Sequence, residues 1–238
     1  MVRETRSPPK TLPSPFVSAS ALLHAKIELV IEPFLDASNK FLGHSRIAAL
    51  YPEYLITLHC VVRSSVPLMQ AALDRAESMA DSDPVAGDLT SYLAAHIEEE
   101  RDHDQWILDD LERLGVERAD VLARLPSHNV AALVGSQYYW VLHFHPVALL
   151  GYLMVSEGYP VAPSVVEELV ERTGYPRDCF RMLAEHAELD PHHGEELDQL
   201  IDSLPLRPDL ETLLGLSAMH TVGFMARCLD EVVESEGS

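Results

Sequence analysis

The segment LTSYLAAHIEEERDHDQWILDDLERLG, residues 89–115, decides the fold because it carries ionisable residues on the apolar face of a helical pattern. At 100° per residue, His96, Glu100 and His103 fall on the same stripe as the Leu and Ile residues before and after them. Burying an unpaired carboxylate costs several kcal/mol, which a fold tolerates when a metal ion or a tight ion pair compensates. The segment therefore predicts a buried helix whose inner face holds either a metal ion or a tight ion pair.

The rest of the chain has the same helical character. Apolar residues recur with a helical period between breaks marked by proline, Gly occurs only 11 times, and no segment has a strand pattern. These features predict an all-α fold, a single bundle of seven to eight helices joined by short loops. Pro33 kinks or divides the first helix, and Pro52 and Pro67 strain the second. The expected helices cover about residues 21–41, 49–79, 84–114, 118–125, 127–157, 163–173, 176–203 and 209–234.

Composition narrows the class of protein. The 238 residues are 47% hydrophobic, and no apolar run approaches the length of a membrane span, so we expect a globular protein that does not cross a membrane. The net charge of −21 argues against binding to nucleic acid or anionic lipid. Residues 1–16 are polar and proline-rich without the apolar core of a signal peptide. We therefore expect a disordered leader, a single domain over residues 17–238, and a cytoplasmic location.

Cysteine and histidine usage points to different roles. Cys60, Cys179 and Cys228 lie far apart in apolar surroundings, which predicts buried thiols rather than disulfides or a CxxC zinc site. Twelve histidines in an acidic chain are more informative, because imidazole and carboxylate together form the ligand set of zinc, non-haem iron and manganese.

The expected helix over residues 176–203 repeats the pattern of ionisable residues on an apolar face. His186, Asp190 and His193 form an H-x3-D-x2-H motif, which places two imidazoles and a carboxylate within about 60° of arc. That arrangement suits facial coordination of one metal. Pro191 lies inside the motif and lacks a backbone N–H, so we expect the helix to be kinked or easily unwound there.

A third helix supplies another carboxylate. Glu157 lies at the C-terminal end of the expected helix over 127–157, where a negative charge opposes the helix dipole unless a cation is near. Three helices thus offer three carboxylates and three imidazoles, about the number that two irons share while open positions remain for O2. The set is too large for one zinc. The six candidate ligands are Glu100, His103, Glu157, His186, Asp190 and His193.

Several of these signals have a second interpretation. Taken alone, Glu100-x-x-His103 is explained equally well by a surface salt bridge. Arg63, in an otherwise apolar helix, either anchors a substrate carboxylate or pairs with a carboxylate of the bundle. His143 is either a hydrogen-bonded core histidine or a substrate contact, and Tyr139 and Tyr152 are candidates to line the same pocket.

Three motifs in order resemble the haem-oxygenase-like diiron oxidases and oxygenases, bacterial proteins often called iron-containing redox enzymes. They are the run HIEEERDHDQW at 96–106, the segment from Gly151 to Gly158, and the H-x3-D-x2-H motif. The resemblance implies a haem-oxygenase-like seven-helix bundle, two irons cycling between Fe(II) and Fe(III), and O2 as co-substrate. It implies a small carboxylate substrate, an amino acid or a fatty acid, that undergoes C–C cleavage, decarboxylation, desaturation or N-oxygenation in specialised metabolism. An external electron donor and a homodimer remain open.

Matching motif positions implies that His103, Glu157, His186, Asp190 and His193 are metal ligands, followed by Glu100. One ligand departs from the family pattern. Several members take a further carboxylate from the preceding helix, where residues 54–72 of this chain offer only His59 and Arg63 as ionisable residues. Other members place Glu seven residues before the helix histidine, and here that position is His96. The second iron is therefore held by His96 or Glu99, bound weakly, or absent.

Two alternatives come from other functional classes. A thiaminase-like or cofactor-free enzyme on the same fold would need a nucleophilic cysteine in its cavity, and none of the three cysteines has a His or acid at helical spacing to activate it. A non-catalytic iron-binding protein would use the same ligands without turnover.

Overall fold

The protein is all-α, as predicted. The computed structural model describes residues 17–159 and 161–235, and these contain no strand. The predicted leader, residues 1–16, lies outside the described residues. No helix in the described ranges is both long and apolar enough to cross a lipid bilayer. The helices are α1 (Ala19–Glu28), α2 (Glu32–Gly43), α3 (Ile47–Val62), α4 (Ser65–Met79), α5 (Pro84–Glu99), α6 (His103–Arg113), α7 (Arg118–Ala123), α8 (His128–His143), α9 (Ala148–Ser156), α10 (Pro163–Thr173), the 3-10 helix η1 (Arg177–Phe180), α11 (Arg181–Ser203) and α12 (Pro208–Glu234).

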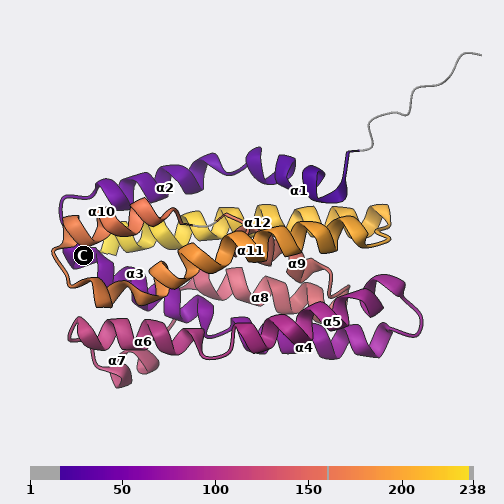
Figure 1. Ribbon diagram of the computed structural model, residues 1–238, viewed down its shortest axis with the longest axis horizontal. Coiled ribbons are helices and arrows are strands. Elements are labelled where there is room, and N and C mark those ends of the chain that lie inside the picture. Colours follow the sequence, from indigo (N-terminus) through magenta and orange to yellow (C-terminus); the bar gives the residue numbers. More distant parts are fainter. Residues whose placement is uncertain (1–16, 160, 236–238) are drawn as a thin grey trace, which may run out of the picture.

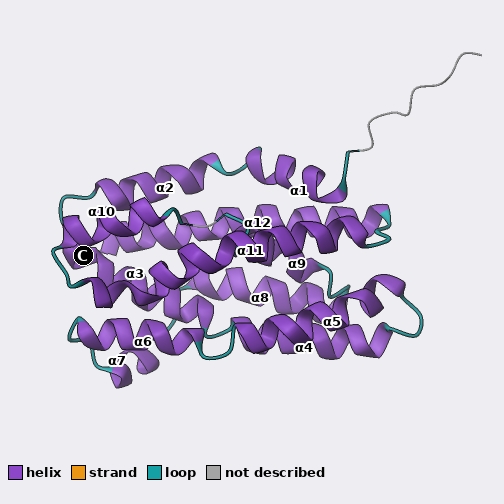
Figure 2. Cartoon of the chain, viewed as in Figure 1, coloured by secondary structure: helices purple, strands orange, loops and turns teal. Residues whose placement is uncertain are grey.

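The helices form an elongated bundle around α12. Figure 1 shows α1 and α2 following one another along one edge and α4 to α7 lying along the opposite edge. The long α12 contacts α1, α2, α3, α8 and α9. Figure 2 shows that short loops join nearly all of the helices. At Gly151 an added Cβ would lie 2.4 Å from the carbonyl oxygen of Leu214, so only glycine allows α9 to cross α12 this closely.

Several long predicted helices are divided. The helix predicted over 49–79 breaks at Arg63 and Ser64 rather than bending at its prolines. Pro67 instead lies in the first turn of α4, where its missing N–H leaves no helical hydrogen bond unmade. The helix predicted over 127–157 breaks between α8 and α9, around Pro146. Pro191, in contrast, stays inside a continuous α11.

The break between α5 and α6 matters most for the site. Glu100 caps the C-terminus of α5, and Asp102 has φ 68°, the left-handed conformation that turns the chain before α6 begins at His103. His96 and His103 therefore lie on different helices, and the prediction of one continuous stripe over 89–115 is wrong. No proline or glycine marks this turn, so the sequence pattern continues across it.

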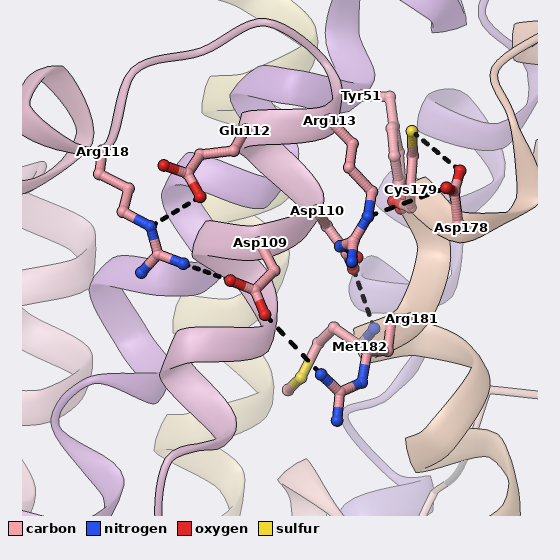
Figure 3. Close-up of polar contacts among 10 residues, drawn as sticks. All are labelled: Tyr51, Asp109, Asp110, Glu112, Arg113, Arg118, Asp178, Cys179, Arg181 and Met182. Atoms are coloured by element: carbon pink, nitrogen blue, oxygen red, sulfur yellow. Dashed lines mark hydrogen bonds and ion pairs between the residues drawn. The ribbon is translucent and has the colours of Figure 1, made fainter.

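The start of α11 is held by a buried carboxylate of α6. The N-terminus of α11 has no side-chain cap of its own. Instead, the fully buried Asp110 of α6 accepts a hydrogen bond from the backbone N–H of Met182 at 2.9 Å (Figure 3). Burial raises the pKa of Asp110 to about 6. Figure 3 also shows Asp109 beside it, pairing with Arg118 and Arg181 at the surface. Asp110 thus joins the helix that begins at His103 to the helix that carries the H-x3-D-x2-H motif.

We expect Asp110→Ala to lower the free energy of unfolding by about 2–3 kcal/mol, because it leaves a buried N–H without an acceptor. Asp109→Ala, which removes only partly exposed ion pairs, should cost less than about 1 kcal/mol. Urea unfolding of the metal-free variants, followed by far-UV circular dichroism, measures both values. Equal effects of the two substitutions would contradict the assignment of Asp110 as the cap of α11.

Candidate metal centre

The structure brings together the ionisable side chains that the sequence singled out. They come from α5, the α5–α6 turn, the start of α6, the end of α9 and the middle of α11. All are buried except His186, which is half-buried. They are His96, Glu100, His103, Glu157, His186, Asp190 and His193.

Two groups of three within this cluster have metal-ligand geometry. In one group, potential ligand atoms of His96, Glu100 and His193 all lie within 4.8 Å of one another. In the other, the same holds for Glu100, His103 and His186. Each group has two imidazoles and a carboxylate, and Glu100 belongs to both. The arrangement can therefore hold two cations that share one carboxylate, as in two-metal sites.

Glu157 joins the first group from the C-cap of α9. Its Oε2 lies 2.9 Å from Nε2 of His96 and 3.4 Å from Nδ1 of His193. Burial alone would raise the pKa of Glu157, but His193 and His96 outweigh it and hold the pKa well below its usual range. Burial would lower the pKa of His96, but the Glu157 and Glu100 carboxylates raise it to about 9. These charges partly compensate one another without a metal.

The compensation is incomplete, because buried polar atoms in the cluster have no hydrogen-bond partner. Such atoms are expensive to bury and are rare in folded proteins. Once deprotonated, these atoms offer lone pairs that face one another, and nitrogen and carboxylate oxygen are suitable ligands for non-haem iron. The residues present therefore fit an iron site. Oε1 of Glu100 and Oδ1 of Asp190 have neither a hydrogen-bond partner nor an ion-pair partner. Nε2 of His96, Nδ1 of His193 and Nδ1 of His103 lie within ion-pair distance of a carboxylate but make no aligned hydrogen bond.

The two remaining candidate ligands, His186 and Asp190 on α11, differ in protonation state and in hydrogen bonding. His186 donates from Nδ1 to the carbonyl oxygen of Met182 at 3.0 Å, which fixes the ring and leaves Nε2 free for a metal. Burial lowers the pKa of His186, so its ring is neutral at pH 7. Burial and the nearby Glu157 carboxylate raise the pKa of Asp190 to about 8. In the metal-free protein, Asp190 therefore holds a proton that a metal must displace.

A family comparison agrees with this ligand chemistry. The model of the family described as "Iron-containing redox enzyme" matches residues 53–222, which include every residue of the cluster. The chain belongs to this family. No curated protein matches the chain.

Solved structures confirm the haem-oxygenase-like fold of this member of the family. A domain of unknown function with that fold from Shewanella denitrificans has a TM-score of 0.71 at 18% identity, covering 92% of this chain and 90% of that one. A CADD-like protein of unknown function from Nostoc punctiforme has a TM-score of 0.68 at 15% identity, covering 92% and 99%. A TenA homolog from Pseudomonas syringae has a TM-score of 0.64 at 14% identity, covering 92% and 94%.

Aromatic side chains that the sequence analysis did not single out pack against the ligand rings of this family member. Trp106 lies against His103 with ring centroids 3.9 Å apart, and the guanidinium of Arg181 lies 4.6 Å above Trp106. Tyr92 stacks on His96 at 5.3 Å, and its buried hydroxyl has no partner. These rings keep water away from the imidazoles and fix their orientation. Their helical spacing to the ligands, three or four residues, was the available signal.

Glu99 lies at the rim of the cluster rather than inside it. Its half-exposed carboxylate approaches Nδ1 of His96 at 3.4 Å and Nε2 of His193 at 3.8 Å. It can orient both rings from outside, as carboxylates do around metal-bound histidines. Of the two residues considered for the missing position, His96 is the one that lies inside a group of metal-ligand geometry.

Two of the residues predicted to contact substrate lie on the protein surface. Tyr139 is 64% exposed and His143 is also exposed, so the prediction that they line an interior pocket is wrong. Their rings contact one another on the surface of α8, with centroids 5.0 Å apart. The error came from assuming one helix over 127–157, because the break after His143 changes which face of α8 is buried.

The other two predicted substrate residues lie closer to the interior. Tyr152 is buried, and its burial, together with the nearby Glu157 and Glu100 carboxylates, raises its pKa. Arg63 is half-buried at the C-cap of α3, next to the break rather than within an apolar helix. Among the described residues no carboxylate lies within ion-pair distance of Arg63, so pairing with a bundle carboxylate does not account for it.

Two glycines allow α11 to pack closely against the end of α9. The sequence analysis did not connect the two. A Cβ added to Gly194 would lie 3.3 Å from the Cα of Gly158. A Cβ added to Gly158 would lie 2.4 Å from the carbonyl oxygen of Met154. Because Gly194 follows His193 and Gly158 follows Glu157, this contact sets the distance between those two ligands.

We expect Gly158→Ala to weaken Fe(II) binding by about tenfold or more, the usual effect of disturbing residues that orient metal ligands. Gly135→Ala is the matched control, because an added Cβ there meets nothing within 4 Å. Anaerobic Fe(II) titration of both variants gives the affinities. Unchanged binding in a well-folded Gly158→Ala variant would show that the tight turn of Gly158 against Met154 does not position Glu157.

The raised pKa values predict proton release on metal binding. In the metal-free protein Asp190 has a pKa of about 8 and His96 of about 9, so both hold protons at pH 7. The Glu157 carboxylate also raises the pKa of His193. Because ligands bind metals in their deprotonated forms, loading should release at least about two protons at pH 7 and markedly fewer above pH 9. Calorimetric titrations in buffers of different ionisation enthalpy measure the number.

The control for this measurement is Asp190→Asn, which carries no titrating proton at that position and should release about one proton fewer. Proton release that is the same at pH 7 and above pH 9 would contradict the assigned ligands.

Proposed function

We propose that this chain is an O2-dependent non-haem diiron oxidase or oxygenase acting on a small carboxylate in specialised metabolism. The observation that carries the proposal is Glu100, a buried carboxylate shared by two groups that each contain two imidazoles. Membership of the iron-containing redox enzyme family supports iron as the metal. The proposed reactions are oxidative C–C cleavage, decarboxylation, desaturation or N-oxygenation of the substrate.

The proposed ligands divide between the two groups. His103 and His186 would hold one iron, His96 and His193 the other, and Glu100 would bridge them. Glu157 lies beside His96 and His193, and Asp190 supplies the remaining carboxylate; both complete the ligand set. In this arrangement His96 takes the place of the carboxylate that the family pattern leads one to expect.

Bound iron would supply electron transfer to O2, with an external donor restoring the electrons. The side chains around the cluster prepare the site for this chemistry. Trp106 and Tyr92 cover ligand rings and keep bulk water out. Met182 fixes the tautomer of His186. Asp190 gives up its proton when metal binds and can take it back when metal leaves.

A thiaminase-like or cofactor-free enzyme on the same fold, with a nucleophilic cysteine in its cavity, is the alternative from another functional class. The structure offers little support for it, because all three cysteines are buried and burial raises the pKa of each thiol. Burial raises the pKa of Cys228, which lines an apolar pocket, to about 12. A thiol with such a pKa is a poor nucleophile at neutral pH.

We expect anaerobic Fe(II) titration to give about two irons per chain, and subsequent exposure to O2 to give oxygen uptake. The His186→Ala variant should lose the iron bound by Glu100, His103 and His186, and it should no longer take up O2. His192→Ala is the matched control, since His192 neighbours the ligand His193 on α11 but is 73% exposed.

Each outcome distinguishes one functional class from another. Iron binding without O2 uptake in the presence of candidate substrates would favour an iron-binding protein over an oxidase. Retention of both irons in His186→Ala would contradict the ligand assignment. Tight binding of one zinc in place of iron would overturn the diiron proposal.

A further inference from the structure

The outer side of α8 is apolar and carries no formal charge. The 16 residues of this helix include no Asp, Glu, Lys or Arg, although these types make up 23% of the chain. A helix at the surface usually has charged residues on the side that faces water. On α8 that side presents Tyr139 and Leu142 instead, and Phe144 is exposed at the C-cap.

The outer side of α12 has the same character. Between Glu211 and Arg227 the helix contains no Asp, Glu, Lys or Arg. Leu216 is 53% exposed, and Met219, three residues later on the same side of the helix, is also exposed. A second uncharged stripe with large apolar side chains therefore reaches the surface on α12.

The two stripes lie on the same side of the bundle. α8 and α12 pack against each other and run in opposite directions, since Asn129 hydrogen-bonds to Glu231 and Ser217 to Gln137. At 100° per residue, the exposed stripe of each helix lies about a third of a turn behind the side that contacts the other helix. In an antiparallel pair of helices, this relation places both stripes on one side.

His220 joins the two stripes across the groove between the helices. It follows Leu216 by one turn, and its Nε2 lies 3.4 Å from the carbonyl oxygen of Ala132 on α8. Its ring also packs edge-on against Trp140, with centroids 5.2 Å apart. The stripes and this contact form one continuous surface, which we call the α8–α12 face. Its members are Tyr139, Leu142, Phe144, Leu216, Met219 and His220.

The net charge of the chain indicates what can cover this face. At −21, two copies of the chain repel one another where their acidic surfaces meet. A partner recognised through opposite charge would bind those acidic surfaces, because the α8–α12 face offers it no carboxylate. A second copy needs a face on which like charges do not meet, and a twofold axis brings the same face of both copies together. The α8–α12 face meets this requirement.

We infer that the α8–α12 face is the interface of a homodimer with twofold symmetry. Protein interfaces are depleted in charge at their centre and enriched in Tyr, Phe and Met, as this face is. Two helices of this length side by side cover about 24 Å by 20 Å, a flat footprint of about 500 Å². Stable interfaces bury about 800 Å² on each partner, so this is a small interface, and we expect the dimer to dissociate near micromolar concentration.

Sedimentation equilibrium of the full chain, from about 0.5 to 200 µM, tests the inference. The mass should rise with concentration from 26.5 kDa toward twice that value. Raising NaCl from about 50 to 500 mM should tighten the dimer several-fold, because salt screens the repulsion between two acidic chains. A dimer that dissociates in high salt, as one held by ion pairs would, contradicts an interface on this uncharged face.

Three lysine variants locate the interface. Leu216→Lys and Tyr139→Lys should each weaken dimerisation by about 100-fold or more, because the twofold axis buries two unpaired charges. Leu122→Lys is the matched control, since Leu122 lies on α7, is 56% exposed and gives the same change in net charge. Far-UV circular dichroism of dilute samples checks that each variant is folded. Equal weakening by all three, or none by the first two, would overturn the assignment.

Other occupants of the face give different results. A mass of 26.5 kDa at every concentration would leave the face to residues 1–16 or to a different protein, and would overturn the inference. A mass that grows beyond two copies would indicate non-specific association through exposed apolar side chains, and would overturn it as well. The measurements need no bound iron, so a dimer in protein that binds no iron would leave this inference standing while the diiron proposal fails.

Discussion

The burial of seven carboxylate and imidazole side chains in one cluster is the constraint on which this structure depends. Glu157 lies between His96 and His193, and this contact lowers the cost of burying all three. Asp190 avoids a further buried charge by holding a proton. Oε1 of Glu100 and Oδ1 of Asp190 nevertheless remain buried without a partner. Bound cations would give these atoms partners, and each buried polar atom left without one lowers the stability of the fold by about 1–3 kcal/mol.

Much of the surrounding fold serves to bring these ligands to one place. The left-handed turn at Asp102 ends α5 and starts α6, so that Glu100 can belong to both groups of ligands. The contact between Gly158 and Gly194 brings the end of α9 against α11. Asp110 fixes where α11 begins, one turn before His186. These features lie in different elements and act on the same cluster.

Residue type and helical spacing were enough to predict the all-α class and to select the side chains that converge. The H-x3-D-x2-H motif was informative because three ionisable residues on one apolar face need compensation. The turn at Asp102 could not be predicted, because Glu100, Arg101 and Asp102 are all compatible with a helix and the conformation depends on tertiary contacts. The same assumption of continuity put Tyr139 on the wrong face. Gly194 carried no signal, since its role depends on a glycine thirty-six positions away in the chain.

Anomalous diffraction at the iron K edge, from crystals grown anaerobically with Fe(II), tests the central claim most directly. The account requires two iron peaks inside the cluster, one within bonding distance of His103 and His186 and the other of His96 and His193, with Glu100 in contact with both. Iron bound only at exposed histidines such as His192, or an iron-loaded protein in which the cluster residues contact no metal, would contradict it.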